Sequence, residues 1–211
     1  MKIISLKSVD STQLYLKEKL KNKELFSPVC VMSDIQTHGV GSRGNRWHTE
    51  EGNMFVSFSL PLSSLVDDLK IESASLYYSY ILKETLQLFG SKVWLKWPND
   101  FYVGELKIGG MITTVVGQDI VCGFGLNIKR APIGFGRLDI DLERLLLLKR
   151  YFENLEKKVL WKQVFSNYKL EFHHNKDFYT HVKGEKINLG DALLQSDGSL
   201  EINGERIYSL R

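Results

Sequence analysis

The segment spanning residues 93–116, VWLKWPNDFYVGELKIGGMITTVV, constrains the fold more than any other part of this chain. Residues 93–97 are rich in β-branched and aromatic side chains, which is typical of a buried strand. Pro98 has no N–H to donate and ends that strand, and the two residues after it have turn chemistry. A short strand at residues 101–103 and a further strand that begins near Leu106 are predicted, separated by a tight turn at residues 104–105.

The last of these strands combines a cation with two adjacent glycines. Lys107 lies two residues before Gly109 and Gly110, so a positive charge precedes a stretch of bare backbone. Glycine in a strand often marks the close approach of a ligand or of another backbone. The arrangement suits an anionic ligand, although a solvated edge lysine and a β-bulge would also account for it.

The composition narrows the class of protein. Of the 211 residues, 43% are hydrophobic and 25% are charged, which is ordinary for a globular protein of one domain or one domain with a small appendage. The net charge of +3 suits an anionic substrate but does not indicate a nucleic-acid surface. Cys30 and Cys122 lie in apolar runs and are expected to be buried free thiols. Without a signal-peptide pattern or a membrane-length apolar run, we expect a cytoplasmic protein with no membrane partner.

The order KWPND, turn, K-x-G-G strongly resembles the biotin protein ligases, and more loosely the wider biotin/lipoate ligase superfamily. The resemblance implies that Lys107 binds both the biotin carboxylate and the α-phosphate of ATP. It also implies that Gly109 and Gly110 let biotin lie against the sheet beside Ile112, and that Asn99 contacts ATP.

A second block, DSTQ at residues 10–13, precedes a predicted helix. Its side-chain oxygens can cap that helix, which is a purely structural explanation. In biotin protein ligases the corresponding D-S-T-N surrounds the biotin ureido ring, so the resemblance implies Ser11 and Thr12 as biotin contacts. Gln13 replaces the asparagine with a side chain one methylene longer, and we do not expect it to contact biotin directly.

A long loop at residues 36–47 matches G-x-G-x-x-G through Gly39, Gly41 and Gly44. A dinucleotide-binding motif must open a helix, but a strand pattern follows here, so that interpretation fails. A long irregular loop in a compact domain is usually functional or mobile.

The same loop resembles the family's Q-T-x-G-R-G-R-x-G-R-x-W, although Val40 and Ser42 stand where the family has arginines. We hypothesise that Arg43 takes over the missing charge as a catalytic and ATP-binding residue. An exposed arginine that is merely solvated is the alternative. The other implied contacts from this loop are Gln36, Gly39 and Trp47 for biotin and Arg46 for ATP.

The region between this loop and residue 172 is predicted to contain the rest of the sheet and three helices. Residues 71–89 form a core helix by their apolar periodicity, and two more helices are predicted between residues 141 and 172. A strand at residues 120–128 resembles the family's I-G-x-G-I-N-V-N, which implies Gly123 beside biotin and Asn127 near ATP. The loop after Arg130 is a candidate wall for the adenine.

The C-terminal part is predicted to be all strands and turns. Short strand patterns punctuated by glycines begin at about residue 177 and suggest a small SH3-like β-barrel, which the family often carries. His173, His174 and His181 lack a metal-ligand spacing, so we expect them at the surface and predict no metal site from protein residues. The expected domains are 1–175, for catalysis and biotin and ATP binding, and 176–211, for the barrel.

The expected fold class is therefore α+β, with a mixed central sheet, helices packed on one face as in biotin/lipoate ligases, and the small C-terminal barrel. The resemblance implies an ATP-dependent ligase, assisted by Mg²⁺, that forms biotinyl-5′-AMP and transfers biotin to a lysine of a carrier domain of the acetyl-CoA carboxylase type. We expect a short form without a DNA-binding domain, and a homodimer is an option. The rivals are a lipoate or octanoate ligase and a non-catalytic biotin sensor, whereas a transcriptional repressor is disfavoured.

Overall fold

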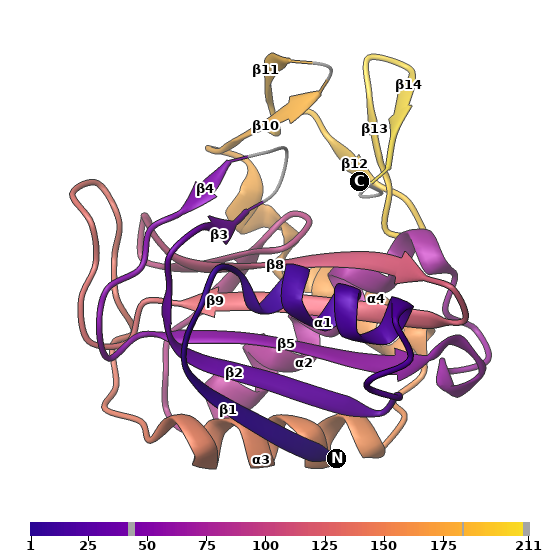
Figure 1. Cartoon of the computed structure of the whole chain (residues 1–211). Helices are drawn as coiled ribbons and strands as arrows, with labels where there is room; N and C mark the ends of the chain where they lie inside the picture. Colours follow the sequence, from indigo (N-terminus) through magenta and orange to yellow (C-terminus); the bar gives the residue numbers. More distant parts are fainter. Residues whose placement is uncertain (42–44, 183, 209–211) are drawn as a thin grey trace.

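A computed structural model describes residues 1–41, 45–182 and 184–208. At its centre lies a seven-stranded sheet in the order β1-β2-β5-β9-β8-β7-β6 (Figure 1). β1 runs parallel to β2, and the other neighbouring pairs are antiparallel, so the expected mixed sheet is confirmed. The strand bounds are β1 Lys2–Val9, β2 Val29–Gln36, β5 Met54–Pro61, β6 Trp94–Lys96, β7 Asp100–Val103, β8 Leu106–Val116 and β9 Asp119–Leu126.

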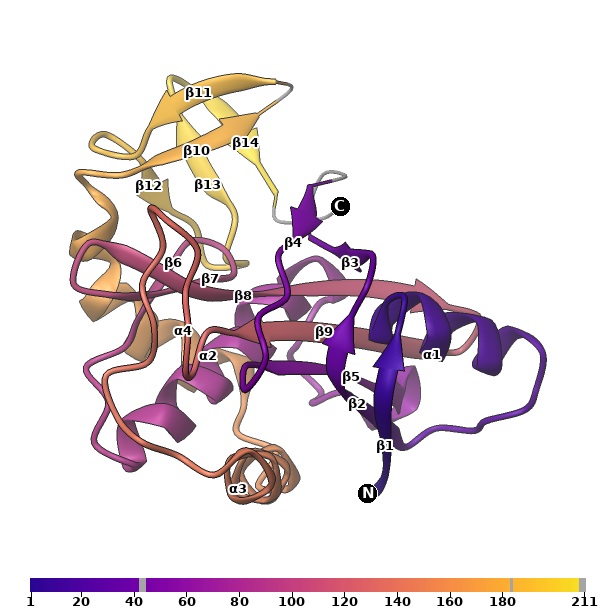
Figure 2. The same cartoon turned by 60° about the vertical axis from the view of Figure 1, so that its left-hand side comes forward.

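Both faces of the sheet carry helices. Successive side chains of a strand point to opposite faces, so Cys30 and Met32 join a large core with α2, α3 and α4, whereas Val31 joins a smaller cluster with Leu16 of α1. α2, α3 and α4 thus lie on one face as expected, but α1 lies on the other (Figure 2). The helix bounds are α1 Thr12–Lys21, α2 Ala74–Leu88, α3 Arg144–Glu156 and α4 Trp161–Glu171, with 3-10 turns at Leu62–Ser64, Ile71–Ser73 and Phe172–Asn175.

The helix α2 presents the predicted apolar face to the sheet. The periodicity also places Leu88 on that face, but this residue is the last of the helix and is 64% exposed. Phe58 of β5 meets the edges of Tyr78 of α2 and Tyr151 of α3, with ring centroids 5.9 and 5.7 Å apart. Each such aromatic pair contributes about 0.5–1.5 kcal/mol beyond area burial, so this cluster fixes the helices on the sheet. The buried members of the predicted face are Ala74, Tyr77, Ile81, Leu82 and Thr85.

The cysteines and histidines lie as predicted. Cys30 and Cys122 are buried free thiols, and burial raises the pKa of Cys30 to about 12, so its thiol stays protonated. His173, His174 and His181 are exposed. Within the described ranges, no helix has the length and apolarity needed to span a membrane.

The C-terminal strands form two small sheets, and in the described residues they do not close into the predicted barrel. Leu200 and Ile202 belong to the same core as α2, and the indole N–H of Trp97 donates to the carbonyl of Gly198 at 2.8 Å. This part therefore packs directly on the central unit, and the division at residues 175 and 176 stays a prediction. The bounds are β10 Tyr179–Val182 and β11 Glu185–Asn188 in one sheet, and β12 Leu193–Leu194, β13 Leu200–Ile202 and β14 Glu205–Ile207 in the other.

Candidate active site

Three glycines on neighbouring strands form the floor of a cavity on the α1 face of the sheet. Gly110 of β8 lies opposite Gly125 of β9, and Ile112 lies opposite Gly123. A Cβ at Gly123 would lie 2.4 Å from Oε1 of Gln13, and one at Gly125 would lie 2.6 Å from the Trp47 ring. Glycine is required at both positions because these two side chains lie directly on the sheet.

The cavity above this floor has a volume of about 360 Å³ and brings together most of the predicted site. It lies between α1, the strands β8 and β9, and the ribbon formed by β3 (Gly39–Val40) and β4 (Arg46–Trp47). The predicted residues that line it are Ser11, Thr12, Gln36, Arg46, Trp47, Asn99, Lys107, Gly110, Ile112 and Gly123.

Three predicted contacts do not line this cavity, and a fourth lies outside the described residues. Gly39 packs beside Trp47 within the ribbon, and Gly109 packs against Phe101 and the backbone of the neighbouring strand. Asn127 is buried and donates to the carbonyl of Gly136 at 3.0 Å, so it anchors the loop that follows β9. Arg43 is the predicted residue that the structure does not describe.

One end of the cavity is a buried network of neutral hydrogen bonds. The backbone N–H of Thr12 donates to Oε1 of Gln36 at 2.8 Å, and its hydroxyl donates to the same oxygen at 3.1 Å. The Thr12 and Ser57 hydroxyls are 2.9 Å apart and share a further hydrogen bond. Ser11 caps α1 by accepting from the N–H of Leu14, so it both caps the helix and lines the cavity.

Two buried polar atoms over the glycine floor have no hydrogen-bond partner among the described residues. They are the amide oxygen of Gln13, an acceptor, and the indole N–H of Trp47, a donor. Gln13 is only 6% exposed, and it lines the cavity although no direct contact was expected from it. Buried polar groups without partners are rare in native proteins, so a ligand with its own donors and acceptors would fit here.

The opposite end is charged. Nζ of Lys107 donates to Oδ1 of Asp100 at 2.6 Å, and Nζ of Lys96 lies 3.8 Å from the other carboxylate oxygen. Asn99 fixes this turn to β8, because its carbonyl accepts from the N–H of Met111 at 2.9 Å and its side-chain amide donates to the Met111 carbonyl. The lysine therefore lies at the cavity with a carboxylate as its partner.

A β-bulge brings Lys107 to the cavity. Phe101 of β7 pairs with Gly109 while Tyr102 pairs with Lys107, so Ile108 is an extra residue in β8. Strict alternation would place Lys107 and Gly110 on opposite faces. With the extra residue, Ile108 enters the main core and Lys107 shares the cavity with Gly110. The sequence left a bulge and a ligand-binding lysine as alternatives, and the structure combines a bulge with a lysine that faces the cavity.

Several lining residues were missed by sequence reasoning. Asp100 is part of the KWPND motif but was interpreted only as a turn residue, and Phe135 comes from the loop that was expected to border the adenine. Asn45 and His48 flank β4 and carry no pattern of their own.

Burial raises the pKa of Tyr102, near the charged end, to about 12, and the Asp100 carboxylate adds to this shift, so the phenol is neutral at physiological pH.

The described residues contain no cluster of three histidine, cysteine or acidic side chains able to hold a metal ion. Mg²⁺ often binds through one or two carboxylates together with substrate phosphates, and Asp100 is the acidic residue among those described around this cavity. The site therefore fits a Mg²⁺ ion that arrives with a phosphorylated ligand.

Comparison with known proteins places this site in a family. Residues 5–127 match the family model of the biotin/lipoate A/B protein ligase family. The bifunctional ligase/repressor BirA of Escherichia coli K12 is 31% identical over 127 residues, which is 57% of this chain and 38% of that protein. The chain thus matches well under half the length of this curated relative.

Solved structures resemble the chain over nearly its whole length. The biotin acetyl coenzyme A carboxylase synthetase of Helicobacter pylori, crystallised with biotinylated ATP, is 38% identical and superposes with a TM-score of 0.94 over 98% of this chain and 99% of that one. The biotin protein ligase of Aquifex aeolicus in complex with biotin and ATP, at 24% identity, covers 100% of this chain and 96% of that one with a TM-score of 0.79, and supports the fold. The chain belongs to the biotin/lipoate A/B protein ligase family.

Proposed function

We propose that this protein is an ATP-dependent biotin–protein ligase, which forms biotinyl-5′-AMP and transfers biotin to a lysine of a carrier domain. The observation that carries the proposal is the asymmetry of the cavity. A ureido ring offers donors and an acceptor to the neutral end, where the amide oxygen of Gln13 lacks a partner among the described residues, and the acid chain of biotin reaches toward Lys107. The name of the H. pylori relative supports the same substrate.

In the first step, a carboxylate oxygen of biotin attacks the α-phosphorus of ATP. A new P–O bond forms, the bond between the α-phosphorus and the bridging oxygen breaks, and pyrophosphate leaves with the electron pair. Nζ of Lys107 donates to the reacting oxygens and steadies the negative charge, after exchanging some of its contact with Asp100. A hydrogen bond to a charged group contributes about 1.5–3 kcal/mol, and more where it tightens in the transition state.

The nucleotide is bound by the cationic end of the cavity. Arg46 and Lys107 line it and carry the positive charges for the phosphates. Mg²⁺, held by the phosphates with Asp100, would neutralise negative charge on the nucleotide. Asn127 contributes to ATP binding indirectly, through the loop that it anchors at Gly136. We also propose Arg43 as a catalytic and ATP-binding residue.

In the second step, the amine of a carrier lysine attacks the carbonyl carbon of the mixed anhydride. An amide bond forms as the amine releases a proton to solvent, the bond from the carbonyl carbon to the phosphate oxygen breaks, and AMP leaves with the electron pair. We propose a carrier of the acetyl-CoA carboxylase type, in keeping with the name of the H. pylori relative. A cytoplasmic location, a homodimer and the lack of a DNA partner stay predictions.

The test is pyrophosphate release by the purified chain with ATP, Mg²⁺ and, in parallel, biotin, lipoate or octanoate, with and without a biotin-carrier domain. We expect release with biotin only and a labelled carrier. Release with lipoate or octanoate but not with biotin would contradict the proposal and assign a different acid. Biotin binding without any release would identify a sensor, for which the loss of the family arginine at Ser42 is the motivating observation.

A further inference from the structure

A second cavity opens beside the first, between the KWPND turn and the C-terminal hairpin of β10 and β11. Its volume is also about 360 Å³. It shares Asn45, Asp100 and Lys107 with the first cavity, so the two are continuous at the charged end. The other charged or titratable basic residues that line it are Lys96, His181 and Lys186.

The lining of this second cavity is net positive, with three lysines and one aspartate among the described residues. Asp100 is the acidic residue among the described residues that line it, and it already faces the amines of Lys107 and Lys96. His181 and Lys186 come from the hairpin on the other side of the cavity, and neither residue has a role in the two reaction steps. An anion with several negative charges would complement this lining.

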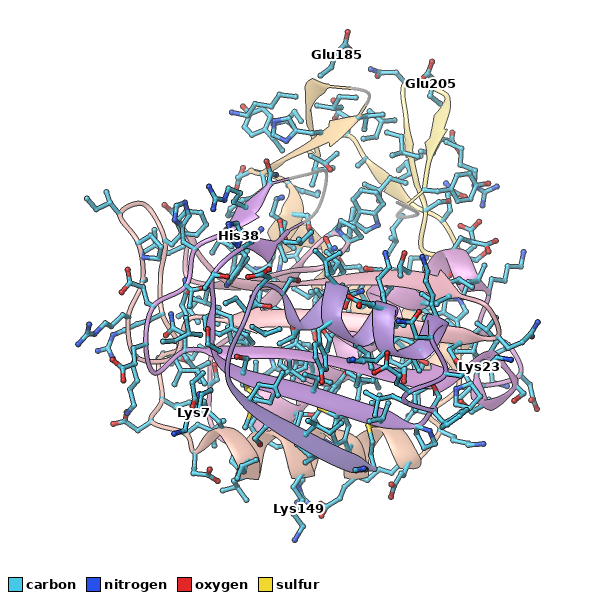
Figure 3. The ribbon with its side chains drawn as sticks, viewed as in Figure 1. Lys7, Lys23, His38, Lys149, Glu185 and Glu205 are labelled. Carbon is cyan, nitrogen blue, oxygen red and sulfur yellow. The ribbon has the colours of Figure 1, made fainter. Side chains whose placement is uncertain are left out.

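The hairpin presents its two basic residues together. His181 of β10 lies directly opposite Lys186 of β11, so both side chains project from the same face of the hairpin. Nζ of Lys186 lies 4.2 Å from the ring centroid of Tyr179, which also lines the cavity. A cation–π contact of this kind restrains the amine near the cavity. Glu185, by contrast, extends from the outer end of the hairpin (Figure 3).

The position of Lys107 relates the two cavities to the chemistry. In phosphoryl transfer the attacking and leaving oxygens lie roughly in line on opposite sides of the phosphorus. If the acid occupies the first cavity and Lys107 holds the α-phosphate, the leaving group is directed away from the acid. The second cavity begins at Lys107 and extends away from the neutral end of the first.

We propose that the second cavity binds the β- and γ-phosphates of ATP and the leaving pyrophosphate, with His181 and Lys186 as binding residues. This inference rests on the proposed adenylation activity and extends the site into the C-terminal hairpin. The hairpin is then part of the nucleotide site and not a passive appendage. An acidic segment of the carrier protein is the rival occupant, and the experiment separates the two.

The experiment compares the full chain with Lys186→Ala, His181→Ala and Lys186→Arg. Lys149→Ala is the matched control, because Lys149 is an exposed lysine on α3 at the far end of the molecule (Figure 3). Calorimetry measures the binding of inorganic pyrophosphate alone, and a biotin-dependent assay measures KM for ATP and for the carrier. Biotin binding without nucleotide and thermal melting report whether the first cavity and the fold are intact.

We expect Lys186→Ala to weaken pyrophosphate binding and to raise KM for ATP by about tenfold, the loss of one charge-assisted hydrogen bond, with biotin binding unchanged. His181→Ala should have a smaller effect, and Lys186→Arg should retain most of the binding. Pyrophosphate binding that is undetectable in the wild type, or equal in Lys186→Ala and Lys149→Ala, would overturn the inference. So would a raised KM for the carrier with an unchanged KM for ATP, which would assign the cavity to the carrier.

The calorimetric measurement of pyrophosphate binding needs no catalysis, so it tests the anion site independently of the ligase activity. If the wild-type chain binds pyrophosphate through Lys186 but releases none with biotin, the proposed anion site stands and the proposed ligase activity is contradicted. If the chain is active with biotin but changes at both hairpin residues have no effect, the ligase activity stands and the anion site is contradicted.

Discussion

The two ends of the first cavity are built in opposite ways. The neutral end is buried, and Thr12, Gln36 and Ser57 are held by their mutual hydrogen bonds. The charged end is more open, with side-chain exposures of 26% for Lys107 and 21% for Asp100, and these two groups are paired with each other. A rigid neutral end suits selection of the ligand, whereas a charged end with an exchangeable partner suits a reaction in which charge moves.

The largest expected effect is at the charged end. Lys107→Ala should fold normally, because the residue is partly exposed, but should lower the rate of biotin-dependent pyrophosphate release by on the order of 100-fold, since it removes a donor to the reacting oxygens. Thermal melting and pyrophosphate release measure the two effects. Wild-type activity in this variant would remove Lys107 from the reaction, and the same loss in Lys149→Ala would indicate a general defect.

The next effect is at the glycine floor of the neutral end. In Gly123→Ala the new methyl group would displace Gln13, because its carbon would lie 2.4 Å from Oε1 of that side chain, and overpacking of this kind costs about 1–3 kcal/mol of stability. We expect biotin affinity, measured by calorimetry, to fall by at least about tenfold. Shortening the side chain at position 13, in the double variant Gln13→Asn/Gly123→Ala, should recover most of the biotin affinity. A double variant no better than the single one would show that Gln13 is not what the methyl group displaces.

A smaller effect is expected from the unpaired indole. Trp47→Phe keeps a ring on Gly125 but removes a buried donor that has no partner among the described residues. Loss of one neutral hydrogen bond should weaken biotin binding by about three- to tenfold, at about 0.5–1.5 kcal/mol. The free protein should melt at the same or a higher temperature, because an unsatisfied buried group disappears. A lower melting temperature together with unchanged affinity would mean that the indole supports the ribbon and does not contact the ligand.

The local motifs predicted the residues of the site better than they predicted its geometry. Lys107, Thr12 and Trp47 could be found from short blocks, because each block keeps its residue types at fixed spacing. The glycine pair made a bulge one option, but the position of the bulge at Ile108, which turns Lys107 into the cavity, depends on how β8 pairs with β7. We expect no direct biotin contact from Gln13 because its side chain is longer than that of asparagine, yet its amide reaches over the sheet to Gly123 at the floor of the cavity.

The fold shows the same limit. The apolar periodicity of residues 71–89 was enough to predict α2, because a helix that packs on a sheet needs a continuous apolar face. The face on which α1 packs depends on the path of the chain between β1 and β2, which periodicity does not encode. Likewise, short strands in the C-terminal part were predictable, but the local pattern does not encode their pairing into two sheets or their contacts with the central unit, such as that of Trp97 with Gly198.

The smallest expected effect tests whether the pairing of Asp100 with Lys107 opposes ligand binding. Asp100→Asn removes the negative partner of Lys107, so the amine no longer has to leave a carboxylate when biotin binds. Partly exposed ion pairs contribute about 0.2–1 kcal/mol, so biotin should bind up to about fivefold more tightly without nucleotide. Calorimetry with biotin alone measures this, with Asp141→Asn, an exposed carboxylate paired with Lys129, as the control. Weaker binding in Asp100→Asn would instead show that the carboxylate positions Lys107 for the ligand, and that the charged end is as rigid as the neutral one.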